Sequence, residues 1–242
     1  PALLSALLQR WRINTLWLTS TLFNQLVDAH VGLFAPLQQL LVGGERLSPG
    51  HVAAVRRAHP HLRVINGYGP TENTTFSTAY TVQGQEAGEL PIGRPIAGSE
   101  ALVVDDDGTP VPLCVPCEIW VGGRGLALGY LNEPELTEAK FVPHPWRPGQ
   151  RAYRTGDRGR WSSDGQLLYL GRLDGQLKIR GFRVEPGEIE GAIRSLLPHS
   201  DVVVLAHEGG EGQPSSLVAY VTGEPELQSL REQLHHRLPE YL

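Results

Sequence analysis

The sequence predicts an α/β protein made of three parts: the end of a parallel α/β subdomain, a β-barrel-like subdomain and a small C-terminal α+β domain. Three observations carry this prediction. Strand and helix patterns alternate in residues 1–80, short runs separated by Gly and Pro fill residues 81–173, and a compact mixture of both patterns follows in residues 174–242. The 242 residues are enough for a core and a smaller appended unit.

Residues 1–80 are expected to alternate between strands and helices. A short apolar run before Ser20-Thr21 predicts a strand, and the hydroxyl pair predicts the cap of an amphipathic helix. Residues 40–42 predict a buried strand, Ser48-Pro49 begin a second helix, and residues 64–65 predict the next strand. This alternation is typical of a parallel sheet, in which ligands bind beyond the carboxyl ends of the strands.

Residues 81–173 carry short alternating runs that predict antiparallel strands, at 92–95, 101–104, 118–121, 159–161 and 167–171. Residues 105–108 (Asp-Asp-Asp-Gly) predict a tight turn, with a calcium loop as the alternative. The four residues 114–117 (Cys-Val-Pro-Cys) suit a redox pair or half of a zinc site. Because no second cysteine pair exists and no helix pattern follows, a structural turn is expected there.

Residues 174–242 predict a compact α+β domain. A hairpin is expected around Gly181, followed by a helix from Pro186. Two strands are then expected, and a last helix has one apolar stripe, made of Leu227, Leu230, Leu234 and Leu238.

The composition is that of a globular protein, with 40% hydrophobic and 19% charged residues and a net charge of −5. The basic residues are dispersed, so nucleic acid is not an expected partner. No apolar stretch approaches the ~20 residues that span a bilayer, and no secretory leader is visible. We therefore expect a cytoplasmic protein with no membrane partner. Because the chain begins with Pro1 and contains no Met, we also expect a fragment of a longer polypeptide.

The most informative stretch is residues 66–72, Asn-Gly-Tyr-Gly-Pro-Thr-Glu. Gly67 and Gly69 lack a Cβ, so a planar heterocycle can approach the Tyr68 ring closely. Thr71 and Glu72 supply oxygen atoms of the kind that a hard cation or a phosphate group needs. The alternative is a tight Gly-Pro turn after a strand.

Two further polar clusters are bounded by glycines, at residues 153–157 (Tyr-Arg-Thr-Gly-Asp) and residues 171–190. A carboxylate in a Thr-Gly-Asp turn can accept hydrogen bonds from both hydroxyls of a ribose, and a nearby Arg can bind a phosphate or that ribose. Each cluster alone is equally typical of a solvated turn.

Together and in this order, these clusters resemble motifs of the adenylate-forming enzymes, and most of all the amino-acid adenylation domain of nonribosomal peptide synthetases. Residues 66–72 are similar to the adenine and magnesium motif of that family. Residues 117–131 resemble its Gly-Glu-Leu…Gly-Tyr-Leu segment, and three more of its motifs are matched by residues 153–157, 171–190 and 238–242.

The chain departs from the family pattern in two respects. Cys114 and Cys117 stand where the family usually has glycine, which favours the structural reading of that pair. The family's phosphate loop, the aspartate that holds the substrate's amino group and the terminal catalytic lysine have no counterpart in these residues. We therefore expect the 242 residues alone to bind nucleotide weakly and to be inactive.

The resemblance implies a reaction in which ATP and Mg²⁺ activate an amino acid to an aminoacyl-adenylate and pyrophosphate is released. The acyl group then passes to the phosphopantetheine thiol of a peptidyl carrier domain. Condensation and other synthetase domains are expected in the same parent chain. The alternatives are an acyl-CoA synthetase-type ligase and a non-catalytic nucleotide-binding fragment.

The resemblance also implies residue roles at the adenosine. Tyr68 stacks on adenine, and Asn66, Gly67 and Gly69 lie along the base. A second wall is formed by Gly43, Gly44 and Glu45. Asp157 binds the ribose hydroxyls, with Tyr169 packed near the sugar. The remaining implied roles concern the phosphates and the metal: Glu72 holds Mg²⁺, and Thr71, Arg172 and Lys178 complete the catalytic set.

The resemblance further implies a hinge at Asp174, with Lys178 just beyond it, and an acyl pocket lined by Trp17, Leu41, Gly43, Gly67, Thr75 and Phe76. That pocket is apolar with one hydroxyl and no charge, so it suits a small branched aliphatic amino acid such as valine. Isoleucine, leucine and alanine stay open, because such pockets separate neighbours by only ~1–3 kcal/mol per methylene.

Overall fold

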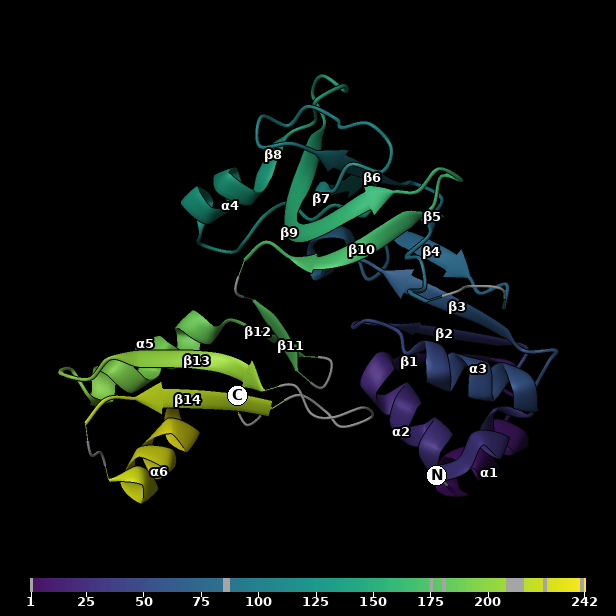
Figure 1. Ribbon diagram of the computed structural model, residues 1–242, viewed down its shortest axis with the longest axis horizontal. Coiled ribbons are helices and arrows are strands. Elements are labelled where there is room, and N and C mark those ends of the chain that lie inside the picture. Colours follow the sequence, from purple (N-terminus) through teal and green to yellow (C-terminus); the bar gives the residue numbers. More distant parts are fainter. Residues whose placement is uncertain are drawn as a thin grey trace. The chain divides into compact units, whose positions relative to one another are not determined.

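The computed structural model describes residues 2–84, 88–174, 176–179, 182–207, 216–223, 226–239 and 242. The chain divides into two compact units, Pro1–Asp174 and Gly175–Leu242. Each unit is described by itself. Among the described residues, the first unit contains two five-stranded sheets, and the second contains two two-stranded sheets and two helices (Figure 1).

The first sheet of unit 1 has the strand order β1-β2-β3-β4-β5. Its strands are β1 (Thr15–Thr19), β2 (Gln39–Gly43), β3 (Arg63–Tyr68), β4 (Thr78–Thr81) and β5 (Arg94–Pro95). The first three are parallel, which confirms the predicted parallel sheet. The last two are antiparallel additions. β4 was not predicted, whereas β5 lies inside the run 92–95 that the sequence indicated.

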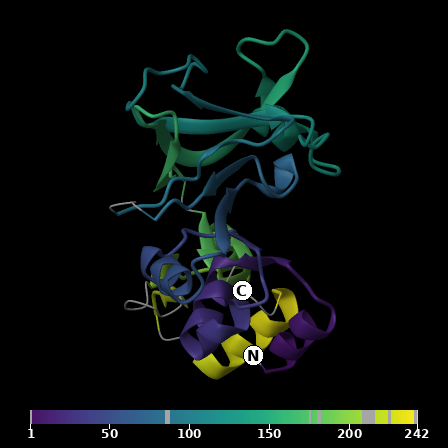
Figure 2. The ribbon, with the colours of Figure 1, turned by 90° about the vertical axis from the view of Figure 1, so that its right-hand side faces the viewer.

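The helices of this part are α1 (Ala2–Arg10), α2 (Ser20–His30), α3 (Pro49–Ala58) and the short 3₁₀ helix η1 (Val31–Phe34). They lie on the side of the first sheet that faces away from the second sheet (Figures 1 and 2). Alternate strand residues such as Leu40, Val42 and Val64 pack there against Phe23 and Val55, and all five are buried. Each such side chain contributes about 1.5–3 kcal/mol on burial.

The other residues of the same strands point to the opposite face of the sheet, called the second face below, because side chains alternate between the two faces. Trp17 is paired with Leu41, Leu41 with Ile65, and Gly43 with Gly67 across the parallel ladder. The core-facing residues Leu40, Val42 and Val64 are apolar, whereas the second face carries Gly43 and Gly67 near the carboxyl ends of β2 and β3.

The second sheet of unit 1 is antiparallel and curled, which confirms the predicted barrel-like part. It consists of β6 (Ser99–Val104), β7 (Cys117–Gly123), β8 (Phe141–Pro143), β9 (Arg151–Trp161) and β10 (Leu167–Arg172), with helix α4 (Pro134–Lys140) before β8. Its core includes Ile119, Val121, Tyr153 and Leu167, and Tyr68 from the end of β3 belongs to the same cluster.

A bulge interrupts β9 in the middle of this sheet. Glu118 pairs with Arg158 and Trp120 pairs with Arg154, so the single residue Ile119 on β7 faces residues 155–157 on β9. Bulges bend a strand and re-aim the side chains that they carry. Gly156 lies at φ 70°, a left-handed conformation that favours glycine. The Thr-Gly-Asp sequence is thus the bulge itself.

Unit 2 contains the hairpin strands β11 (Leu177–Ile179) and β12 (Phe182–Val184), then α5 (Pro186–Leu196), the antiparallel pair β13 (Val202–His207) and β14 (Ser216–Val221), and α6 (Leu227–Arg237). The core is formed by Val184, Ile189, Ile193, Val202 and Val204. This arrangement confirms the predicted α+β character. The turn expected at Gly181 lies outside the described residues.

Two loops of unit 1 are the expected turns. The Gly108 N–H donates to Asp105 O, and Asp105 Oδ1 accepts from the N–H groups of Asp107 and Thr109. In the cysteine loop the Val115 N–H donates to Pro112 O, and both thiols are free. Among the described residues, no helix combines the length and the apolar character that a membrane crossing needs.

Candidate active site

The bulge of β9 brings Asp157 against Tyr68 and Arg172, which lie far apart in the sequence. The Tyr68 hydroxyl donates to Asp157 Oδ2 at 2.5 Å, and Arg172 Nη1 donates to Asp157 Oδ1 at 2.9 Å. Asp157 is 3% exposed and Tyr68 is 7% exposed. Arg172 is the direct partner of Asp157 in the β9–β10 ladder. The structure therefore brings together three of the predicted nucleotide-binding residues.

Two tyrosines stand beside this carboxylate. The rings of Tyr68 and Tyr169 lie 6.2 Å apart with an interplanar angle of 42°. Burial, and then the Asp157 charge, raise the pKa of Tyr68 well above its usual value. The same two causes raise the pKa of Tyr169 to about 12. Because the folded pKa is raised, both phenols stay protonated at neutral pH and Tyr68 remains a hydrogen-bond donor.

Arg172 joins Asp157 to the last residue of unit 1. Its Nε donates to Asp174 Oδ1 at 2.7 Å and its Nη2 to Asp174 Oδ2 at 2.5 Å, a bidentate pair. A Cβ at Gly156 would lie 2.6 Å from Asp174 Oδ2 and 2.8 Å from Arg172 Nη2. Glycine is therefore required at the centre of the bulge, both by its left-handed backbone and by this close approach.

Glu72 lies in the 3₁₀ helix η2 (Thr71–Asn73) and is 7% exposed. Its Oε1 accepts hydrogen bonds from the Tyr130 hydroxyl at 2.6 Å and the Tyr153 hydroxyl at 2.9 Å. Burial, and then the hydrogen bond to Glu72, raise the pKa of Tyr130. Thr71 precedes Glu72 and is exposed. The carboxylate is thus held in one orientation by two phenols, Tyr153 on β9 and Tyr130 in the segment between β7 and α4.

Sequence reasoning assigned no role to Tyr130 or Tyr153. Both tyrosines lie inside stretches that it singled out, residues 117–131 and 153–157. A tyrosine in a β-rich stretch reads equally well as core, and only the register of β9 turns Tyr153 toward Glu72. The available signal was a tyrosine close to a motif glycine, since Tyr130 follows Gly129 directly and Tyr153 precedes Gly156 by three residues.

The turn Gly43-Gly44-Glu45 follows β2 and is held by the start of α2. Ser20 Oγ donates to Glu45 O at 2.9 Å and to Gly43 O at 3.2 Å, and Thr21 Oγ1 donates to Glu45 Oε2 at 2.9 Å. The prediction that Ser20 and Thr21 cap the helix is wrong. The N-cap residue is Thr19, it makes no side-chain cap bond, and the two hydroxyls bind the turn instead.

The predicted acyl-pocket residues lie on the second face of the first sheet. A Cβ at Gly67 would lie 2.6 Å from the Phe76 ring, and one at Gly43 would lie 2.3 Å from Gly67 O. The Phe76 and Trp17 rings lie 6.3 Å apart, edge to face at 63°. Thr75, beside Phe76, is exposed and lies at φ 61°. The two glycines are therefore needed by the chain's own Phe76 ring and backbone.

Replacing Gly67 by alanine is expected to lower the free energy of unfolding by about 1–3 kcal/mol, because the new methyl group meets the Phe76 ring in a packed site. Urea unfolding followed by tryptophan fluorescence measures this change. Gly50→Ala, on the open surface of α3, is the matched control. It is expected to leave stability unchanged or slightly raised. Equal effects of the two substitutions would contradict the packing described for Phe76.

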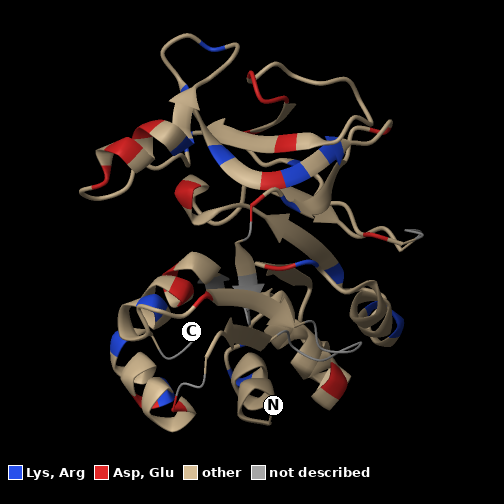
Figure 3. Ribbon diagram, turned by 60° about the vertical axis from the view of Figure 1, so that its left-hand side comes forward, with Lys and Arg blue, Asp and Glu red and all other residues tan. Residues whose placement is uncertain are grey.

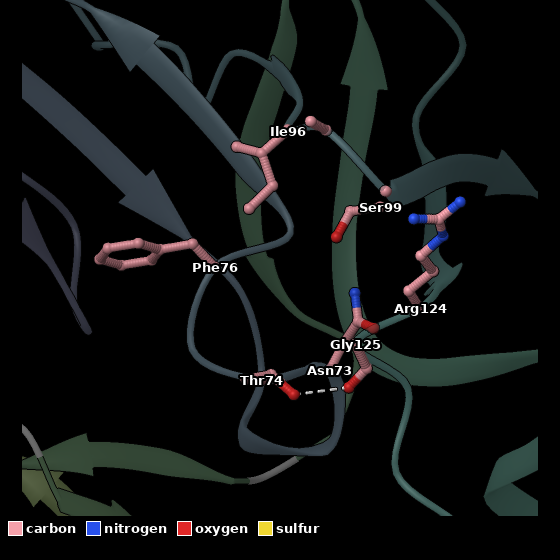
Figure 4. Close-up of a pocket in the computed structure, with 9 residues that line it drawn as sticks. Asn73, Thr74, Phe76, Ile96, Ser99, Arg124 and Gly125 are labelled. Atoms are coloured by element: carbon pink, nitrogen blue, oxygen red, sulfur yellow. Dashed lines mark hydrogen bonds between the residues drawn. The ribbon is translucent and has the colours of Figure 1, made fainter.

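A cavity of about 450 Å³ borders Phe76 on the side of the second sheet. Figure 4 shows Ser99 and Arg124 on one side of it and Phe76 and Ile96 on the other. The Thr74 hydroxyl donates to Gly125 O at 2.7 Å at its base. Phe76 is shared with the predicted acyl pocket, and the sequence assigned no role to any of the other lining residues.

Asn66 and Lys178 are predicted site residues for which no contact with the Asp157 cluster is described. The Asn66 side chain donates from Nδ2 to Pro91 O at 2.8 Å and is 4% exposed. Lys178 lies on β11 in unit 2, and its side chain lies outside the described residues.

Comparison with known proteins gives one family and a consistent set of relatives. Residues 1–131 match the family described as AMP-binding enzyme. The chain is 49% identical over 233 residues to tyrocidine synthase 3 of Brevibacillus parabrevis, covering 96% of this chain and 4% of that protein. It is 44% identical over 240 residues to surfactin synthase subunit 2 of Bacillus subtilis, covering 98% of this chain and 7% of that protein. The chain thus spans less than a tenth of either relative.

Solved structures agree with these relatives. Holo-PA1221, an NRPS protein with adenylation and PCP domains bound to a vinylsulfonamide inhibitor, has a TM-score of 0.88 and 39% identity, covering 97% of this chain and 41% of that one. NpsA-ThdA, an artificially fused adenylation–PCP di-domain from Klebsiella oxytoca, has a TM-score of 0.87 and 26% identity, covering 100% and 45%. The chain therefore belongs to the AMP-binding enzyme family, and over nearly its whole length it is similar to proteins of nonribosomal peptide synthesis.

Proposed function

We propose that this chain forms the adenosine-binding part of an enzyme that activates an amino acid with ATP, giving an aminoacyl-adenylate and pyrophosphate, for nonribosomal peptide synthesis. The observation that carries this proposal is the buried cluster of Tyr68, Asp157 and Arg172 in a chain of the AMP-binding family. The activity is proposed for the protein that contains this chain, in the cytoplasm.

Asp157 has the chemistry that a ribose requires. A carboxylate offers about four acceptor positions, and the described contacts with Tyr68 and Arg172 use two of them. The two ribose hydroxyls supply two donors. Arg172 fixes the rotation of the carboxylate, and the hydrogen bond from the Tyr68 hydroxyl fixes the Tyr68 ring, which then offers a defined face to adenine.

Glu72 fits a magnesium ion held jointly with a nucleotide. Among the described residues, no three His, Cys, Asp or Glu side chains converge on one point. Mg²⁺ at nucleotide sites commonly takes one or two carboxylates together with phosphate oxygens, so a single fixed carboxylate suits it. When bound, the ion neutralises phosphate charge. Tyr130 and Tyr153 orient the Glu72 carboxylate toward that task.

Asp174 supports the proposal of a hinge, because it is the last residue of unit 1 and is bound by Arg172. A motion there would gate the reaction between adenylate formation and thiol transfer, with Lys178 on the moving side. The transfer partner is proposed to be the phosphopantetheine thiol of a peptidyl carrier domain. The solved neighbours that contain both adenylation and PCP domains support this partner.

The substrate is proposed to be a small branched aliphatic amino acid such as valine. Trp17, Leu41, Gly43, Gly67 and Phe76 supply an apolar face with no charge. Exchange of radioactive pyrophosphate into ATP by the full-length protein, measured across a panel of amino acids, tests both the activation reaction and the proposed substrate. We expect the highest exchange with valine or a close aliphatic neighbour. Strongest exchange with a charged or a large aromatic amino acid would contradict this pocket, and no exchange with any amino acid would contradict the activity.

A further inference from the structure

The bulge that presents Asp157 is held in place by a residue with no assigned role, Glu118 on β7. Resting on the proposed adenosine site, we infer that Glu118 is a positioning residue for ribose recognition. It acts through the backbone of Gly156, the residue next to Asp157, rather than by touching the nucleotide.

The two oxygens of Glu118 divide their contacts between the bulge and the strand beside it. Oε1 accepts the Gly156 N–H at 3.0 Å. Oε2 accepts from Arg154 Nη2 at 3.1 Å and Nε at 3.3 Å. The Glu118 side chain is 10% exposed, whereas Arg154 is 39% exposed. Residues of both charge signs lie close together on the strands of this sheet (Figure 3).

The bulge needs such a support because its residues leave the regular ladder. The Thr155 hydroxyl supplies one tie, donating to Ile119 O at 2.6 Å and accepting the Asp157 N–H at 2.9 Å. Glu118 supplies the other tie at Gly156. A charged acceptor gives the stronger bond, worth about twice a neutral one. The two ties fix the backbone on both sides of the peptide that leads into Asp157.

Arg154 keeps Glu118 available for this role. Its guanidinium lies 5.6 Å from the centre of the Trp120 ring and pairs with Oε2, so the carboxylate is neutralised on the side away from the bulge. Without Glu118, the Gly156 N–H and the Arg154 guanidinium both lose their described partner. Asp157 then keeps its side-chain contacts but loses the fixed backbone that aims it.

The test compares the affinity of the full-length protein for AMP with its affinity for 2′,3′-dideoxy-AMP, by calorimetric titration. The ratio of the two affinities isolates the ribose hydroxyls. Glu118→Ala is expected to weaken AMP binding by about 10- to 100-fold, as small misplacements of a binding group do. Dideoxy-AMP binding is expected to change by less than about threefold, so the ratio falls. Glu118→Gln keeps an acceptor for Gly156 and is expected to give a smaller fall.

Glu100→Ala is the matched control, since Glu100 is a partly buried glutamate on the neighbouring strand β6. It pairs with His144 at 2.9 Å and Arg147 at 3.1 Å and has no described contact with the bulge. This variant is expected to lose stability and keep the wild-type affinity ratio. A wild-type ratio in both Glu118 variants, or an equal fall in Glu100→Ala, would overturn the inference. If Glu118→Ala does not fold, the Glu118→Gln ratio decides.

The same titrations separate this inference from the proposed function. Wild-type protein that binds neither nucleotide would overturn both. Wild-type protein that binds AMP and discriminates against the dideoxy analogue, with unchanged discrimination in the Glu118 variants, would leave the adenosine site standing and remove Glu118 from it.

Discussion

Replacement of Asp157 by asparagine is expected to weaken AMP binding by about 100-fold or more, the largest effect of any single change in this chain. The carboxylate provides charged acceptors for two ribose hydroxyls, and hydrogen bonds to charged groups are worth about 1.5–3 kcal/mol each. Asparagine replaces these charged acceptors by one neutral oxygen and one N–H donor, and a loss of about 3 kcal/mol corresponds to two decades at 1.4 kcal/mol per tenfold change. Calorimetric titration with AMP measures the affinity.

The same substitution is expected to lower the stability of unit 1. Arg172 and Asp157 are 12% and 4% exposed, so the pair is nearly buried. Breaking a buried pair costs about 3–5 kcal/mol, and Asp174 keeps part of that interaction, so we expect a loss of about 2–3 kcal/mol. Asp106→Asn, in the exposed turn after β6, is the control and is expected to change neither property. An AMP affinity in Asp157→Asn within threefold of wild type would remove the carboxylate from ribose binding.

Glu72→Gln is expected to reduce ATP–pyrophosphate exchange by about 100-fold or more while AMP binding changes by less than about threefold. The amide keeps an oxygen for Tyr130 and Tyr153 but loses the negative charge that a magnesium ion needs. Adenine and ribose are bound elsewhere, at Tyr68 and Asp157. The dependence of exchange on Mg²⁺ concentration separates a metal defect from a general loss of activity.

Substitutions of the two tyrosines that bind Glu72 are expected to give a smaller effect on the same property. Tyr130→Phe and Tyr153→Phe each remove one donor to Glu72, and each is expected to raise the Mg²⁺ concentration for half-maximal exchange by about tenfold, as partners of metal ligands do. Glu135→Gln, on the exposed surface of α4, is the control and is expected to leave the Mg²⁺ dependence unchanged. Wild-type Mg²⁺ dependence in Glu72→Gln would show that this carboxylate holds no metal.

The sequence predicted the parts of the fold that have a readable period. β1 is an apolar run before Ser20-Thr21, β2 and β3 are apolar runs that lead to glycines, and α5 begins at a proline, so these elements could be placed from residue types alone. β4 has four residues and β8 has three, and neither strand was predicted from the sequence. Ser20 and Thr21 show a second reason why a prediction from the sequence fails. Their hydroxyls suit a helix cap, and the tertiary contact with residues 43–45 decided their use.

The candidate site divides in the same way. Tyr68, Glu72, Asp157 and Arg172 stand in recognisable motifs, so their chemistry was visible in the sequence. Their supports were hidden, because Glu118 is separated from Gly156 by 38 positions and Tyr153 from Glu72 by 81. Those contacts depend on the register of β7 against β9 and on the bulge between them. Neither the register nor the bulge can be predicted from residue types alone.

The adenosine site is tested most directly by a crystal structure of the full-length protein with AMP bound. We expect the adenine ring to lie against the Tyr68 ring, and both ribose hydroxyls to lie within hydrogen-bond distance of the Asp157 carboxylate. We also expect Gly156 N–H to remain bound to Glu118. AMP bound away from Tyr68, or a ribose whose hydroxyls contact other groups, would contradict the assignment of this site.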